Sequence, residues 1–304
     1  MELQWPLILF TTLVAWSAGV FGTQAVLALR DDAPKAQLPC WITAAVLLAA
    51  GGIAVFFHLE HFERIFNGFG HLTSGITQEL IAIVVLAVAA VVYLVYLRRP
   101  GGRVPAWLAV LSVVLSVVLV VVMAHSYMMS ARPAWDSVLW ILYVLGNACV
   151  LGPATVALIC AATHEPVKMA GVIALAGAAV NAVTTIAYAV TLQFLEGSFT
   201  TVGFYSDPTQ PTSPLMDVSA VGNVFTGDLA PLMWIGVIAL GAVVPLVAAL
   251  LERRGTAAVS AEGAEAATSR VELWMAVAVV AAVIGAICMR VVFYELGASV
   301  FMLY

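Results

Sequence analysis

The chain has 304 residues, of which 63% are apolar and only 10% are Asp, Glu, Lys or Arg, and its formal net charge is −5. A soluble domain carries about 25% charged residues, so this chain has too few charges to cover a water-exposed surface. The absence of a basic cluster excludes nucleic acid as an expected partner. Four cysteines occur, without a C-x-x-C pair, at Cys40, Cys149, Cys160 and Cys288. We therefore expect neither an iron–sulfur cluster nor another metal site on this chain.

Eight apolar stretches are each long enough to cross the bilayer, which takes about 20 residues in a helix. In chain order they cover residues 5–29, 41–62, 76–97, 105–130, 136–162, 168–195, 229–251 and 271–300. A helix satisfies its backbone hydrogen bonds internally, whereas strands of a membrane barrel would alternate polar and apolar residues. The sequence therefore predicts an all-α, multi-pass membrane bundle of eight transmembrane helices, forming one domain over residues 1–304.

Two connections between these stretches are long. Residues 196–228 hold four acidic residues and no Lys or Arg, and residues 252–270 have the composition of a flexible linker. Basic residues set the orientation, because they favour the cytoplasmic side. Two lie in connections that follow even-numbered stretches, and nine lie in those that follow odd-numbered ones: Arg30, Lys35, Arg98, Arg99, Arg103, Lys168, Arg253, Arg254 and Arg270. Both termini and the 196–228 loop are then expected outside, and the 252–270 linker in the cytoplasm.

Ionisable residues gather at the outer ends of four stretches, where such groups are costly and usually functional. A quinol head group releases two protons as it gives up two electrons, and a His or Glu within reach can accept them. We predict that His58 and Glu79 take this catalytic role. The predicted quinol-binding residues are His58, Arg64, Glu79, Tyr127, Arg290 and Tyr294.

Structural roles are open for the same residues. Glu79 can pair with Arg64 or cap its helix, the two arginines can anchor the interface, and Tyr127 and Tyr294 fit an ordinary aromatic belt. Polar and helix-breaking residues deeper in the spans are interpreted as interhelical hydrogen bonds and kinks. They are Asn147, Pro153, Asn181, Thr184 and Thr185.

Five short motifs occur in order along the chain. They are Trp5-Pro6-Leu7 with Phe10-Thr11; His58-Leu59 with Arg64, Phe66 and Asn67; Ser74-Gly75-Ile76-Thr77-Gln78-Glu79; Tyr127 with Pro133, Trp135 and Ser137; and Arg290 with Val292, Phe293 and Tyr294. Together they resemble the membrane-anchor subunit of bacterial dimethyl sulfoxide reductase, a respiratory molybdoenzyme.

The resemblance implies a complex of three parts in the cell membrane. The anchor oxidises menaquinol without haem, an iron–sulfur subunit takes the electrons, and a molybdopterin subunit reduces the terminal acceptor in anaerobic respiration. His58 and Glu79 match family positions linked to quinol binding. Two alternatives are kept: a b-type cytochrome anchor with His58 and His125 as axial ligands, and a secondary transporter.

Overall fold

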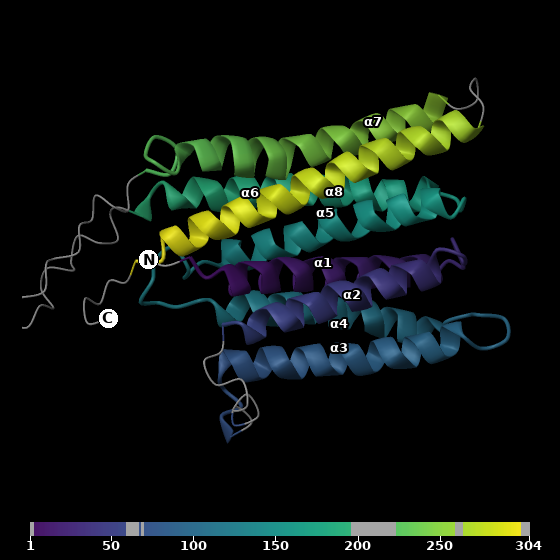
Figure 1. Cartoon of the computed structure of the whole chain (residues 1–304), viewed down its shortest axis with the longest axis horizontal. Coiled ribbons are helices and arrows are strands. Elements are labelled where there is room, and N and C mark those ends of the chain that lie inside the picture. The colour runs from purple at the N-terminus through teal and green to yellow at the C-terminus, as the bar shows by residue number, and fades with distance from the viewer. Residues whose placement is uncertain (1–2, 59–66, 68–69, 196–222, 259–263, 299–304) are drawn as a thin grey trace, which may run out of the picture.

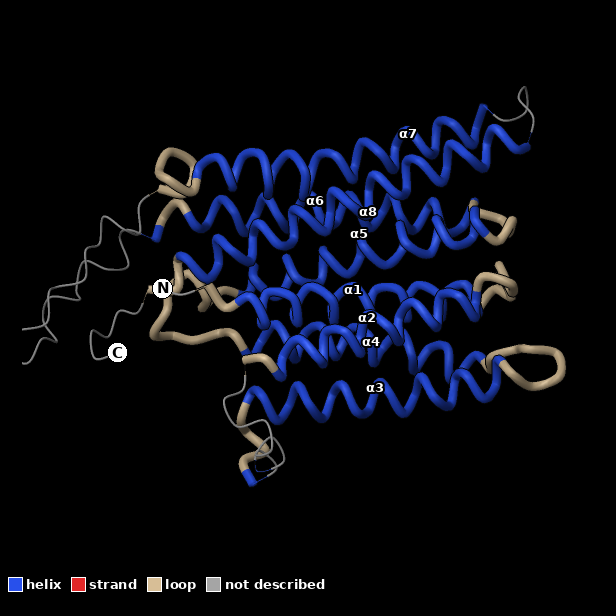
Figure 2. Tube along the Cα trace, in the orientation of Figure 1, coloured by secondary structure: helices blue, strands red, loops and turns tan. Residues whose placement is uncertain are grey.

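A computed structural model describes residues 3–58, 67, 70–195, 223–258 and 264–298. Within these ranges it contains eight helices that are long and apolar enough to cross a membrane, and no strand (Figures 1 and 2). Their bounds are α1 (Trp5–Ala28), α2 (Gln37–Phe56), α3 (Gly75–Leu97), α4 (Ala106–Ser126), α5 (Val138–Ala162), α6 (Lys168–Leu192), the π-helical segment η5 (Leu232–Val243) continued by α7 (Val244–Ala258), and α8 (Ala264–Glu295). The predicted all-helical architecture is confirmed.

Successive helices run in opposite directions, so α1 begins and α8 ends at the same end of the bundle (Figure 1). We call this the terminal end. Helix α1 packs against α2, α4, α5 and α8, and α5 packs against α1, α6 and α8. Helix α3 lies at one margin, where its main neighbour is α4. The core of the bundle is therefore built around α1 and α5.

Small residues and prolines explain how the helices approach so closely. Pro153 has no N–H to give the carbonyl four residues before it, that of Cys149, and this carbonyl faces Gly177 on α6. A methyl group at Gly177 would overlap the Cys149 oxygen. Without a hydrophobic drive between helices in lipid, such close van der Waals packing holds them together.

A second proline acts similarly in the seventh span. Pro245 leaves the Gly241 carbonyl without its usual donor, and Asn181 Nδ2 on α6 donates to that oxygen at 2.8 Å. Asn181 in turn accepts from Asn147 Nδ2 on α5 at 2.9 Å. The interpretation of both asparagines as interhelical hydrogen-bonding residues is confirmed.

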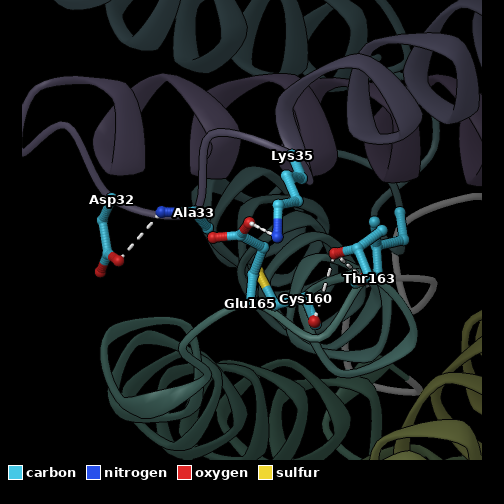
Figure 3. A network of polar contacts seen from close by, with 7 residues as sticks. Asp32, Ala33, Lys35, Cys160, Thr163 and Glu165 are labelled. Atoms are coloured by element: carbon cyan, nitrogen blue, oxygen red, sulfur yellow. Dashed lines mark hydrogen bonds and ion pairs between the residues drawn. The ribbon is translucent and has the colours of Figure 1, made fainter.

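The end opposite the termini is fastened by polar contacts between two connections. Lys35 Nζ, after α1, lies 3.7 Å from the Glu165 carboxylate, after α5. Figure 3 shows this pair beside Thr163, whose hydroxyl donates to the carbonyls of Ile159 and Cys160 at the end of α5. The contact ties α5 to the α1–α2 turn. All four cysteines are free, and Cys40 and Cys160 are buried.

Two boundaries differ from the sequence prediction. Helix α2 ends at Phe56 rather than near residue 62, which leaves His58 in the turn that follows. The 252–270 stretch is mostly helical, because α7 continues to Ala258 and α8 begins at Ala264. Its many Ala, Glu and Arg residues favour helix, so the described part of the expected flexible linker is helical.

Candidate functional site

A buried carboxyl, Glu79, lies near the start of α3, at the terminal end of the bundle. The residue is 7% exposed, and its Oε1 accepts a hydrogen bond from the hydroxyl of Ser126, the last residue of α4. The close approach of the two helices depends on Gly75, where a Cβ would lie 2.7 Å from the Ser126 Cβ. The first turn of α3 thus presses Glu79 against the end of α4.

Two phenols stand beside this carboxyl. Tyr127 directly follows α4, Tyr294 lies in the last turn of α8, and both are buried. Each phenol interacts electrostatically with both Glu79 and Arg290. The Tyr294 hydroxyl is shielded from solvent, and it interacts with the Tyr127 hydroxyl. The two phenols therefore form a buried polar pair inside the site.

The guanidinium of Arg290 is buried, with 1% of the residue exposed. Its Nε donates to Thr11 Oγ1 on α1 at 2.8 Å, and its Nη1 donates to Asn147 Oδ1 on α5 at 2.8 Å. Nη1 also donates to the Ala286 carbonyl at 3.0 Å. No described carboxylate lies within ion-pair distance of Arg290, so a fixed positive charge remains inside the bundle. These contacts assign it to the core rather than to the membrane interface.

Glu79, Ser126, Tyr127, Arg290 and Tyr294 form what we call the acid–arginine cluster. An aromatic stack supports its α8 side: Phe293 lies 4.0 Å from Trp140 and 4.7 Å from Trp135 between ring centroids. Trp135 Nε1 also donates to the Phe293 carbonyl at 2.6 Å. The last turn of α8 is therefore held rigidly between α5 and the loop that follows α4.

The structure unites four of the six predicted quinol-binding residues: Glu79, Tyr127, Arg290 and Tyr294. His58 is exposed, and its Nδ1 lies 3.0 Å from Gln4 Oε1, just before α1. Arg64 lies outside the described residues, so the expected Arg64–Glu79 pair has no structural account. The hydrogen-bond partner described for Glu79 is Ser126.

Sequence reasoning missed Ser126 and Gly75 as parts of this site. A serine at a helix end is common and does not by itself indicate a functional role, unlike its neighbours His125 and Tyr127. The roles of Thr11 and Asn147 as partners of Arg290 were also missed, because they come from helices far apart in the sequence. His125, the second candidate haem ligand, is exposed in the last turn of α4.

A family model described as DMSO reductase anchor subunit (DmsC) matches residues 1–205. The chain belongs to this family. The match spans α1 to α6 and thus includes Glu79 and Tyr127, while Arg290 and Tyr294 lie beyond it. No curated protein matches the sequence.

Membership in the DMSO reductase anchor family confirms the resemblance drawn from the short motifs. It makes this chain a multi-pass membrane subunit of an oxidoreductase complex, associated with the catalytic and electron-transfer subunits of that complex.

Proposed function

We propose that this anchor subunit oxidises menaquinol at the acid–arginine cluster and passes the electrons to an iron–sulfur subunit. A molybdopterin subunit then reduces the terminal acceptor, in the manner of a dimethyl sulfoxide reductase. Family membership supports the role of anchor. The single observation that carries the quinol site is the buried Glu79 carboxyl, placed among hydrogen-bonding groups near the terminal end of its span.

The proposed chemistry divides between proton acceptors and fixed donors. Each menaquinol becomes menaquinone and releases two protons and two electrons. Glu79 is the proposed proton acceptor within the cluster, and the exposed His58, outside the cluster, is the second proposed acceptor. The electrons leave for the iron–sulfur subunit. The Tyr294 hydroxyl, beside that of Tyr127, can donate to an oxygen of the head group. The fixed charge of Arg290 favours the negative charge that develops on the head as its proton departs.

We further propose that the terminal end faces outside the cell and that the iron–sulfur subunit docks there. The basic residues of the chain support this orientation, because nine of twelve belong to connections at the opposite end. Electron tunnelling weakens steeply with distance, so the first acceptor must lie near the quinol head. The acid–arginine cluster lies toward the terminal end, which makes that end the productive docking face.

Substitution of Glu79 and His58 in the whole complex tests this function. Membranes containing wild type, Glu79→Gln or His58→Ala are assayed with menaquinol and, separately, with a soluble artificial donor that reduces the catalytic subunits directly. We expect both variants to lose quinol-driven turnover and to keep the artificial-donor activity. General acid–base groups contribute about 10²- to 10⁴-fold to rates, so the loss is large enough to measure clearly.

The two assays separate chemistry from assembly. Loss of both activities in a variant reports a complex that has not formed. Quinol-driven turnover near the wild-type rate in Glu79→Gln contradicts the proposed site. The same result in His58→Ala alone removes His58 from the mechanism and leaves Glu79 as the proton acceptor.

A further inference from the structure

One face of α3 leads inward from Glu79. Glu79, Leu86 and Tyr93 recur at intervals of seven residues, which places them on the same side of the helix, and all three are buried. Glu79 meets Ser126 on α4, whereas Tyr93, further along the same face, contacts Phe21 on α1 and Gln37 on α2. A molecule bound at Glu79 can therefore extend along the side of α3 that carries Leu86 and Tyr93.

An apolar groove of about 360 Å³ lies along this face, between α1, α2 and α3. Its lining on α3 begins at Ile83, four residues after Glu79, and continues through Leu86 and Ala87. The facing walls include Phe21 on α1 and Ala45 on α2. The groove thus starts one helical turn from the carboxyl and is almost wholly apolar.

Hydrogen bonds close the far end of this groove. Trp41 Nε1 on α2 donates to the Ala90 carbonyl on α3 at 2.9 Å. One turn further, the Tyr93 hydroxyl donates to Gln37 Oε1 at 2.8 Å. Helix α3 is therefore bonded to α2 below the groove, and the two helices stand apart between these bonds and Glu79.

A second apolar groove provides a comparison. It has a volume of about 310 Å³ and lies between α1, α4, α5 and α6. Neither α3 nor α8 contributes to its lining, and its lining on α4 stops at Val120, six residues before Ser126. Along α4, this groove thus ends more than one helical turn before Ser126, the partner of Glu79.

We propose that the groove between α1, α2 and α3 binds the isoprenoid tail of the quinol while Glu79 holds the head group. This inference rests on the proposed quinol oxidation. The position of the groove supports one occupant, a flexible apolar chain attached to a polar head at Glu79. A tail lying here fixes the direction from which the head meets the carboxyl, and it keeps the substrate in place during proton transfer.

Blocking the groove distinguishes substrates with and without a tail. Ala87→Phe, on the α3 wall, and Ala45→Phe, on the α2 wall, each place a ring in the groove. Ala176→Phe is the matched control, because Ala176 lines the other groove. The KM of each variant is measured in membranes containing the whole complex, once with menaquinol and once with a naphthoquinol that lacks the tail.

We expect Ala87→Phe and Ala45→Phe to raise the KM for menaquinol by about tenfold, which corresponds to about 1.4 kcal/mol of binding free energy. Their KM for the tail-less naphthoquinol stays near the wild-type value, since the head site is intact. Ala176→Phe leaves both constants unchanged. Both KM values are measured in the same membrane preparation. A smaller amount of assembled complex therefore cannot produce a difference between them.

Two results overturn the inference. An equal change, or no change, for both substrates in Ala87→Phe and Ala45→Phe means that ordinary lipid fills the groove. A tail-dependent change in Ala176→Phe alone moves the tail to the other groove. If wild-type membranes oxidise neither quinol, the proposed function itself fails, and this outcome is distinct from both.

Discussion

Gly75 and Ser126 meet where α3 begins and α4 ends, so closely that a methyl group on Gly75 would lie 2.7 Å from the Ser126 Cβ. The contact sets the position of Glu79, which lies one turn further along α3 and accepts a hydrogen bond from Ser126. A residue without a side chain thus fixes the proposed proton acceptor.

Gly75→Ala is expected to lower quinol-driven turnover by at least about tenfold, because the added methyl group forces α3 away from α4 and displaces the Glu79 carboxyl. The rate is measured in membranes against the artificial-donor activity. Gly52→Ala is the matched control, since Gly52 is also helical but has no atom within 4 Å of the position that a methyl group would take. Equal quinol rates in the two variants would show that the close approach is not needed.

Ser126→Ala is expected to change the pH dependence of quinol oxidation. The Ser126 hydroxyl has one hydrogen and faces two acceptors, Glu79 Oε1 and the Met123 carbonyl, the latter at 2.8 Å. An ionised Glu79 can only accept this hydrogen, and hydrogen bonds to charged groups are the stronger ones. Without the hydroxyl, the acid limb of the pH–rate profile should move to higher pH by about one unit.

The control for this experiment is Ser112→Ala. Ser112 lies on the same helix and is buried, and its hydroxyl donates to the Leu108 carbonyl of that helix. A role of Ser126 in helix packing alone predicts a lower rate at every pH with an unchanged profile. A profile that keeps its wild-type midpoint in Ser126→Ala therefore removes this serine from the proton-transfer step.

Asn181→Ala is expected to destabilise the bundle. The substitution leaves the Asn147 amide and the Gly241 carbonyl without the partner they have now, and an unsatisfied buried group costs about 1–3 kcal/mol. The thermal midpoint of the detergent-solubilised complex should fall by roughly 2–8 °C. Thr191→Ala is the control, because the hydrogen bond described for its hydroxyl stays within α6, to the Tyr188 carbonyl. An unchanged midpoint in Asn181→Ala would show that lipid or water replaces the lost bonds.

Reporter fusions test the orientation. We expect a reporter inserted between α7 and α8, within residues 259–263, to be active only in the cytoplasm, because the neighbouring connections are rich in basic residues. A reporter fused before Trp5 should be active only outside. Activity of the first fusion outside the cytoplasm would reverse the topology, and the proposed docking face would move with it.

Cross-linking locates the partner subunit. A photoreactive residue at His71, exposed near the terminal end of α3, is expected to capture the iron–sulfur subunit in intact membranes. The same probe at Arg99, at the other end of α3, is the control. Capture from Arg99 rather than His71 contradicts docking at the terminal end. The acidic 196–228 loop, expected outside from the sequence, lies mostly outside the described residues.

The α8 side of the site shows how far sequence reasoning reaches. Arg290 and Tyr294 are visible as polar residues in an apolar span, and their cost in lipid marks them as functional candidates. Their surroundings are not visible in this way. Thr11 and Asn147 reach Arg290 from α1 and α5, and nothing in their spacing along the chain predicts that these helices meet.

The sequence by itself determined the number of spans, the helical class, the family resemblance and most of the candidate residues. These properties depend on local composition, because a bilayer accepts only long apolar segments whose backbone bonds are internal. The tertiary structure alone decided that Ser126 binds Glu79, that Arg290 belongs to the core, and that a groove lies beneath the carboxyl. Those relationships depend on how helices pack at glycines and freed carbonyls, and in lipid this packing is set by the fit between surfaces rather than by hydrophobicity.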